Sequence, residues 1–175
     1  MLVTLIRPPS MTAKWVPGMI ATPPLAHAYL AGMLTSNGHD VKVIDAVGEA
    51  LHQKTSLDDT FAIYGLTAAE VVERIPKSVG LIGISCMFTQ EWPNVRRLAR
   101  AIKTAFPEVP IVVGGEHVTA EPEFSLRDLP EIAAVISGEG EETLLEVAHC
   151  LEKGESLDAL PGLALVKDGQ FVKNP

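Results

Sequence analysis

Two glycine-rich segments directly follow apolar, β-branched runs and are the clearest sign of a binding site in the sequence. Gly114-Gly115 follows the run 111–113, and Gly138-Glu139-Gly140 follows the run 133–136. Glycine lets a ligand approach the main chain and lets N–H groups point outward. Glycine is also an ordinary turn residue, so either segment alone fits a plain strand end equally well. Two such segments after neighbouring runs favour a pocket.

Side chains that could contact a ligand stand beside these segments. The run 81–85 ends at Ser85 and is followed by Cys86-Met87-Phe88-Thr89, while Gly114-Gly115 is followed by Glu116-His117-Val118-Thr119. Histidine can ligate a metal or titrate near neutrality. A loop histidine bonded to local main chain is at least as common, so both interpretations of His117 stay open. The other four histidines lack ligand spacing, and no protein zinc site is expected.

Several kinds of catalytic or phosphate-binding motif are absent from the sequence. Arg7-Pro8-Pro9-Ser10 follows the first apolar run, where a dinucleotide fingerprint would need its glycines. There is no nucleophile elbow, no Ser-His-Asp order and no glycine-rich lysine loop. The carboxylates of Glu139, Glu141 and Glu142 would repel a phosphate. We therefore expect no catalytic residue and no protein metal ligand, but a binding site for a large ligand that is not strongly anionic.

The elements that must position these residues alternate along the chain. Five apolar runs are separated by segments with helical periodicity, which is typical of βαβ units with a parallel sheet. The runs do not alternate apolar with polar residues, as expected for strands covered on both faces. The strands are expected at 2–6, 41–44, 81–85, 111–113 and 133–136, and the helices at 25–34, 67–75, 93–106, 121–129 and 141–153.

Three segments fall outside this alternation. Residues 10–23 and 47–65 are predicted to be long loops, of the kind that is usually functional or mobile. Residues 163–172 are predicted to form a hairpin with its turn at 167–170, appended to a finished sheet. Asn174-Pro175 has the character of a linker. The predicted organisation is one domain over 1–160, followed by a hairpin and linker over 161–175.

Composition narrows the class of protein. The 175 residues suit one domain, and 14 Lys and Arg against 22 Asp and Glu give a net charge of -8, which opposes binding to nucleic acid or to an anionic membrane. The basic residues at 96, 97, 100 and 103 recur at helical spacing, as on a solvated helix face. No apolar run approaches a membrane span and no signal peptide is visible, so a cytoplasmic protein without membrane insertion is expected. Cys86 and Cys150 are expected to be reduced structural thiols.

The motifs, taken in order, resemble the N-terminal cobalamin-binding domain of cobalamin-dependent radical SAM enzymes, and the resemblance spans nearly the whole chain. It is carried by Arg7-Pro8-Pro9, Leu30-Ala31-Gly32-Met33-Leu34 followed by Gly38-His39-Asp40-Val41, Gly114-Gly115-Glu116-His117-Val118-Thr119, and Gly138-Glu139-Gly140-Glu141-Glu142-Thr143.

The resemblance implies a site at the strand ends. The corrin ring would lie over these ends, and its dimethylbenzimidazole tail would descend into a slot lined by Ser85, Met87 and Gly114-Gly115 and bordered by Gly138 and Gly140. The full set of residues implied in cobalamin binding is Pro8, Pro9, Ser85, Cys86, Met87, Thr89, Gly114, Gly115, Glu116, His117, Thr119, Gly138, Glu139 and Gly140.

Two departures from the family pattern matter. Methionine-synthase-like members carry a cobalt-ligating histidine after the first strand, but residues 8–12 contain none, so cobalt is expected to be held without a protein imidazole beneath it. Cys86 and Cys150 cannot supply the three-cysteine motif of a radical SAM enzyme. S-adenosylmethionine and a 4Fe-4S cluster would therefore belong to a catalytic domain in cis or in trans. The linker-like ending favours an excised domain over a stand-alone carrier.

The sequence thus predicts a flavodoxin-like (Rossmann-like), doubly wound parallel sheet of five strands, in the order 2-1-3-4-5, that binds cobalamin. The parent enzyme is expected to be a methyltransferase or an anaerobic oxidative cyclase. One alternative is an interaction domain of the same ancestry that has lost cobalamin. Another is a flavodoxin-like or receiver-like signalling domain, although Arg7-Pro8-Pro9 and Cys86-Met87 disagree with the acidic residues that a receiver needs.

Overall fold

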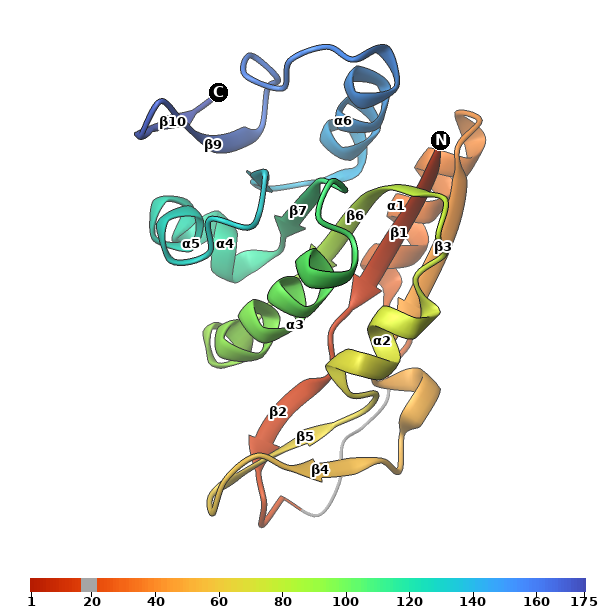
Figure 1. The fold of residues 1–175 in the computed structure, drawn as a ribbon, viewed down its shortest axis with the longest axis vertical. Coiled ribbons are helices and arrows are strands. Elements are labelled where there is room, and N and C mark those ends of the chain that lie inside the picture. The colour runs from red at the N-terminus through yellow and green to blue at the C-terminus, as the bar shows by residue number, and fades with distance from the viewer. Residues whose placement is uncertain (17–21) are drawn as a thin grey trace.

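The computed structural model describes residues 1–16 and 22–175, and a mainly parallel sheet with helices on both faces lies at its centre (Figure 1). Among these residues, seven strands form the sheet in the order β10-β9-β8-β7-β6-β1-β3. The strands β3, β1, β6, β7 and β8 are parallel neighbours, so the order reads 2-1-3-4-5 in the numbering of the five expected strands. The predicted α/β fold is confirmed. The strand bounds are Leu2–Arg7 (β1), Asp40–Asp45 (β3), Val79–Ser85 (β6), Ile111–Gly114 (β7), Ala134–Ile136 (β8), Leu163–Lys167 (β9) and Gln170–Lys173 (β10).

Side chains of the central strands point alternately into two apolar layers. Leu5 packs in one layer with Leu34 and Leu144, whereas Ile6 packs in the other with Leu98. Both faces are buried, which explains why these strands read as unbroken apolar runs. Helices α1 and α6 cover the first face, and α2, α3, α4 and α5 cover the second. The helix bounds are Leu25–Ser36 (α1), Ala68–Arg74 (α2), Trp92–Ala105 (α3), Glu116–Ala120 (α4), Pro122–Asp128 (α5) and Glu141–Lys153 (α6).

The C-terminal hairpin is present, but its relation to the sheet differs from the prediction. Asp168 and Gly169 both have positive φ, as a two-residue hairpin turn requires. The hairpin is not an appendage, because β9 pairs antiparallel with β8 and makes the sheet seven-stranded rather than five-stranded. The physical reason is that the apolar residues 163–165 become buried when they cover the otherwise open edge of β8.

A second sheet lies beyond the C-terminal ends of the parallel strands (Figure 1). It consists of β2 (Ser10–Ala13), β5 (Phe61–Tyr64) and β4 (Lys54–Ser56), which pair antiparallel in the order β2-β5-β4. The short helix η1 (Gly48–Ala50) precedes β4. The prediction that 10–23 and 47–65 are plain loops is therefore wrong for these strands, while residues 17–21 lie outside the described part.

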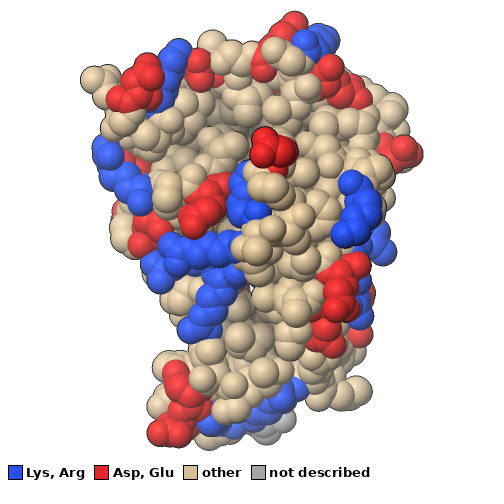
Figure 2. Space-filling view, in the orientation of Figure 1, with Lys and Arg blue, Asp and Glu red and all other residues tan. Residues whose placement is uncertain are grey.

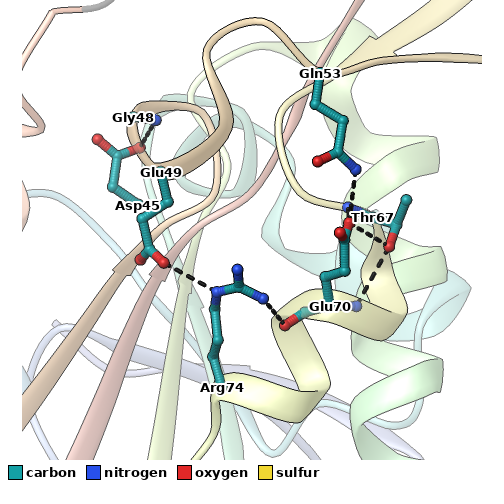
Figure 3. Close-up of polar contacts among 7 residues, drawn as sticks. All are labelled: Asp45, Gly48, Glu49, Gln53, Thr67, Glu70 and Arg74. Atoms are coloured by element: carbon teal, nitrogen blue, oxygen red, sulfur yellow. Dashed lines mark hydrogen bonds and ion pairs between the residues drawn. The ribbon is translucent and has the colours of Figure 1, made fainter.

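A capping box begins α2 (Figure 3). The Glu70 N–H donates to Thr67 Oγ1 at 3.3 Å, and the Thr67 N–H donates to Glu70 Oε2 at 2.8 Å. Gln53 Nε2 also donates to Glu70 Oε2, at 2.7 Å, and Arg74 Nε donates to Glu49 Oε2 at 3.0 Å. These bonds tie the segment around η1 to α2.

Thr67→Ala is expected to lower the free energy of unfolding by about 1 kcal/mol, because it removes the cap of α2. The backbone N–H of Thr67 and the side chain of Gln53 lower the pKa of Glu70. Ionised Glu70 therefore contributes to the free energy of unfolding above the ordinary carboxyl pKa. This contribution is lost as the pH falls through the lowered pKa of Glu70. Urea unfolding at neutral and acidic pH measures both effects. The control is Thr104→Ala, which removes an exposed hydroxyl within α3 and should leave the free energy of unfolding unchanged. An equal decrease in both variants would contradict the prediction.

The basic residues of α3 are largely engaged by neighbouring groups. Arg96 donates to Asp128 at 2.6 Å and Arg100 to Glu131 at 3.1 Å, and Lys103 donates to two main-chain carbonyls. Figure 2 shows basic and acidic side chains intermingled over this face of the molecule. Across the described ranges, no helix is long and apolar enough to cross a membrane.

Candidate functional site

A cavity of about 820 Å³ opens at the C-terminal ends of the parallel strands. Residues from the ends of β1, β6, β7 and β8 form its floor, and the first turns of α1 and α6 form its sides. Parallel strands carry their binding sites at this edge, because the connecting loops diverge there. The cavity is thus in the place that the glycine segments predicted.

The most buried part of the cavity is an apolar slot, made by Leu5, Leu30, Gly83, Val112, Ile136 and Leu144. Leu5, Gly83 and Val112 are paired neighbours across three strands, and Ser85, Gly114 and Ile136 form the next row. Small residues at 85 and 114 keep side-chain volume away from this patch of the sheet, whereas the Leu5 side chain lies over Gly83, where a Cβ atom would be 3.1 Å from Leu5 Cδ2. The slot therefore suits a flat, apolar ring.

Gly115 connects the end of β7 to α4 in a conformation that a side chain would obstruct. Its φ is +113°, and a Cβ atom there would lie 2.5 Å from the carbonyl oxygen of Cys86. The close approach is held by the Cys86 N–H, which donates to the Gly114 carbonyl at 2.8 Å, and by the His117 N–H, which donates to the Cys86 carbonyl at 3.2 Å. Glycine at 115 thus lets two strand ends meet beside the cavity.

The other end of the cavity carries a polar corner, made by Arg7, Ser10 and Glu91. Ser10 Oγ donates to Glu91 Oε1 at 3.1 Å. Burial raises the pKa of Glu91, and the bond from Ser10, the charge of Arg7 and the main-chain N–H of Phe88 offset this only in part. Arg7 donates to the Thr22 carbonyl at 2.8 Å and lies 3.4 Å from the Asp45 carboxylate. The corner therefore holds a carboxyl group that is protonated more readily than an exposed glutamate.

Most of the predicted site residues lie on the cavity wall, and four do not. Those on the wall are Pro8, Ser85, Met87, Gly114, Gly115, Glu116, Thr119, Gly138, Glu139 and Gly140. Pro9 supports the cavity from outside, because its carbonyl accepts a bond from Asn94 at 2.6 Å. The Cys86 side chain is fully buried, and burial raises the pKa of its thiol to about 12. A role in binding for each of these residues stays a prediction.

His117 and Thr89 contact each other rather than the cavity. His117 Nδ1 lies 3.2 Å from Thr89 Oγ1, and the imidazole packs 5.2 Å from the Trp92 ring. Trp92 in turn donates to Asp128 at 2.8 Å. Burial lowers the pKa of His117. Within the described residues, no cluster of three or more His, Cys, Asp or Glu side chains could hold a metal ion. His117 therefore packs in the second apolar layer.

Several cavity residues were not predicted from the sequence. The slot residues Leu5, Leu30, Val112 and Leu144 look like ordinary core positions in the sequence. Gly83 carried a usable signal, because a glycine inside an apolar strand often marks close approach of another group. Glu91 and Ser10 carried none, since they are 81 positions apart and meet only through the fold.

Comparisons with known proteins identify the same kind of domain. The family model described as "B12 binding domain" matches residues 21–148. The chain is 34% identical over 176 residues to an uncharacterized methyltransferase of Pyrococcus horikoshii, covering 100% of this chain and 35% of that protein. It is 34% identical over 159 residues to the cytidylyl-2-hydroxyethylphosphonate methyltransferase of Streptomyces wedmorensis, covering 88% of this chain and 29% of that protein. It is 31% identical over 156 residues to the anaerobic magnesium-protoporphyrin IX monomethyl ester cyclase of a Synechocystis species, covering 86% of this chain and 28% of that protein.

Solved structures share the fold. The radical S-adenosylmethionine methyltransferase TsrM from Kitasatospora setae, with cobalamin and a 4Fe-4S cluster bound, superposes with a TM-score of 0.71 at 22% identity, covering 99% of this chain and 28% of TsrM. The cobalamin-dependent S-adenosylmethionine radical enzyme OxsB, with aqua-cobalamin and S-adenosylmethionine bound, superposes with a TM-score of 0.76 at 20% identity. The match covers 99% of this chain and 22% of OxsB. The chain spans about a third of the length of the curated relatives, or less.

Proposed function

This chain belongs to the B12-binding domain family, and from that premise we propose that it holds cobalamin across the cavity at the C-terminal ends of β1, β6 and β7. The observation that carries this placement is the apolar slot. Ser85 and Gly114 leave its floor open, and Leu30 and Leu144 form its sides. A slot of this kind matches the flat base at the end of the nucleotide tail of cobalamin. No comparison supports the signalling or non-binding alternatives.

The residues present fit the corrinoid in distinct ways. The slot would exclude water from the tail, and Gly114-Gly115, Gly138 and Gly140 would let the tail run against the main chain. Met87 and Phe88, exposed by 49% and 56%, offer apolar contact to the ring. Bound corrinoid supplies a cobalt centre that can carry a methyl group. The part of this chain is to bind and orient the corrinoid.

We propose that cobalt receives no imidazole from this chain, because residues 8–12, directly after β1, contain no histidine. His27 is the histidine on the cavity wall; it is buried on α1, and burial lowers its pKa. An electron paramagnetic resonance spectrum of the cobalt(II) form with nitrogen coupling that His27→Ala removes would overturn this part of the proposal.

We also propose that the domain works with a radical SAM catalytic domain, in cis or in trans. The curated relatives are longer than this chain and include methyltransferases and a cyclase. S-adenosylmethionine and the 4Fe-4S cluster would reside on that domain, because Cys86 and Cys150 are both buried here. Residues 161–175 would lead toward it. Methyl transfer or anaerobic oxidative cyclisation is the reaction proposed for the complete protein.

The first test is retention of the corrinoid. The purified chain is mixed with hydroxocobalamin, free ligand is removed by gel filtration, and the visible spectrum of the protein peak is recorded. We expect retained corrinoid at close to one per chain. A chain that circular dichroism shows to be folded, and that retains no corrinoid, would overturn the proposal.

A further inference from the structure

Glu91 is one of two partly buried carboxylates on the cavity wall, the other being Glu141 at the start of α6. Glu91 is the last residue of the short helix η2 (Thr89–Glu91), which follows β6 in the sequence. Its side chain is partly buried and lies on the cavity wall. Glu116 and Glu139, which also border the cavity, are exposed to solvent. A carboxyl group withdrawn from water into a binding cavity loses hydration, and this is compensated only when a partner replaces the water.

The side chain of Ser10 donates a hydrogen bond to the Glu91 carboxyl group. Ser10, 8% exposed, donates to Oε1 at 3.1 Å, and the main-chain N–H of Phe88 also favours the ionised form. Ser10 belongs to β2, which β5 holds in place through antiparallel pairing. The carboxyl group is thus positioned by Ser10 at the wall of the cavity.

The charged and titratable groups around Glu91 come from several elements. Arg7, at the end of β1, is the nearby cation, but it donates to Thr22 and lies beside Asp45. Cys86, after β6, stays neutral because burial raises its pKa to about 12. His27, also on the cavity wall, has a pKa lowered by burial. Since burial raises the pKa of Glu91, its neutral carboxylic acid form persists above the ordinary carboxyl range.

We propose, on the basis of the proposed function, that Glu91 binds a primary carboxamide on the rim of the corrin ring through its carboxylic acid form, with Ser10 fixing its orientation. The acid O–H donates to the amide carbonyl, and the acid carbonyl accepts from the amide N–H. An ionised carboxylate keeps only the second of these bonds. Corrin rims carry neutral amides, so a neutral partner that both donates and accepts matches them better than a fixed charge.

The affinity for cobalamin is expected to fall as the pH rises. The acid form binds more tightly, so affinity is greatest below the pKa of Glu91 and falls as the pH rises through it. The test measures the Kd of methylcobalamin, whose own ionisations lie outside the range, from about pH 5 to about pH 8. The wild-type chain is expected to lose about tenfold in affinity across the range.

Two substitutions separate hydrogen bonding from charge. Glu91→Gln keeps one donor and one acceptor without a titrating proton, so its affinity should stay within about threefold of the acidic wild-type value at every pH. Glu91→Leu keeps the volume but loses both bonds, and should bind about tenfold more weakly than acidic wild type throughout. Glu108→Gln, an exposed carboxyl between α3 and β7, removes the same charge and should keep the wild-type profile.

The outcomes distinguish this inference from the proposed function. If the folded wild-type chain binds no cobalamin at any pH, the proposed function fails. If the wild type binds but Glu91→Gln keeps the pH dependence, the titrating group is another one, such as His27, and the inference is overturned. Equal affinities of Glu91→Gln and Glu91→Leu would overturn it as well. Urea unfolding of each variant confirms that the fold is intact.

Discussion

Gly114→Leu is expected to abolish retention of cobalamin, with a loss in affinity of at least about 100-fold, or about 2.7 kcal/mol. Gly114 lies between Ser85 and Ile136 on the sheet face that forms the cavity floor. A leucine side chain there would occupy the space assigned to the nucleotide tail, and the rigid strand beneath it has no room to move away.

Gly114→Ala is the matched variant and should lower affinity by less than about fivefold. A Cβ atom at 114 would meet the Ile136 carbonyl oxygen at 3.8 Å and the Ile136 Cβ at 3.9 Å, which are ordinary contacts. The fold therefore accepts a methyl group. Titration of both variants with hydroxocobalamin measures the difference. A folded Gly114→Leu chain that binds as tightly as wild type would show that the corrinoid tail lies elsewhere.

Gly115→Ala is expected to lower the free energy of unfolding by about 3 kcal/mol or more. Two effects add at this position: a φ of +113° that side chains avoid, and a Cβ atom 2.5 Å from the oxygen and 2.8 Å from the carbon of the Cys86 carbonyl. Both opposing atoms are main chain, so no side-chain rotation relieves the clash. The loop before α4 must shift, which also disturbs the cavity wall.

Gly154→Ala isolates the backbone effect from the clash. Gly154 ends α6 with φ +68°, and nothing lies within 4 Å of the position of its Cβ atom. Alanine there should reduce the free energy of unfolding by only about 1 kcal/mol. Urea titration monitored by circular dichroism gives both values. Equal losses in the two variants would show that the contact with Cys86 adds nothing to the strain.

The sequence alone was sufficient to predict the central sheet and the edge at which the cavity lies. The runs that became β1, β3, β6, β7 and β8 are local patterns, and right-handed crossovers leave few ways to order parallel strands. Caps depend on neighbouring residues too: Thr67 and Glu70 cap the start of α2, and Gly154 ends α6. Gly114-Gly115 and Gly138 marked strand ends, which in a parallel sheet share one edge.

Tertiary structure alone decided the features that join distant residues. The pairing of Ser10 with Tyr64 creates a second sheet from strands too short to show a period. The pairing of Leu163 with Ile136 draws the hairpin into the main sheet.

The chemistry of the cavity was also decided by the tertiary structure. Leu5, Val112 and Leu144 belong to the buried apolar layer under α1 and α6, and they also line the cavity, because Gly114 leaves space at the end of β7. Burial also decides which polar groups face the cavity and how they titrate. His117 packs against Trp92, whereas Glu91 lies beside Ser10 and has a pKa raised by burial. Periodicity records only which face of an element a residue occupies. Which distant side chain it meets there, and how much water it loses, depends on packing.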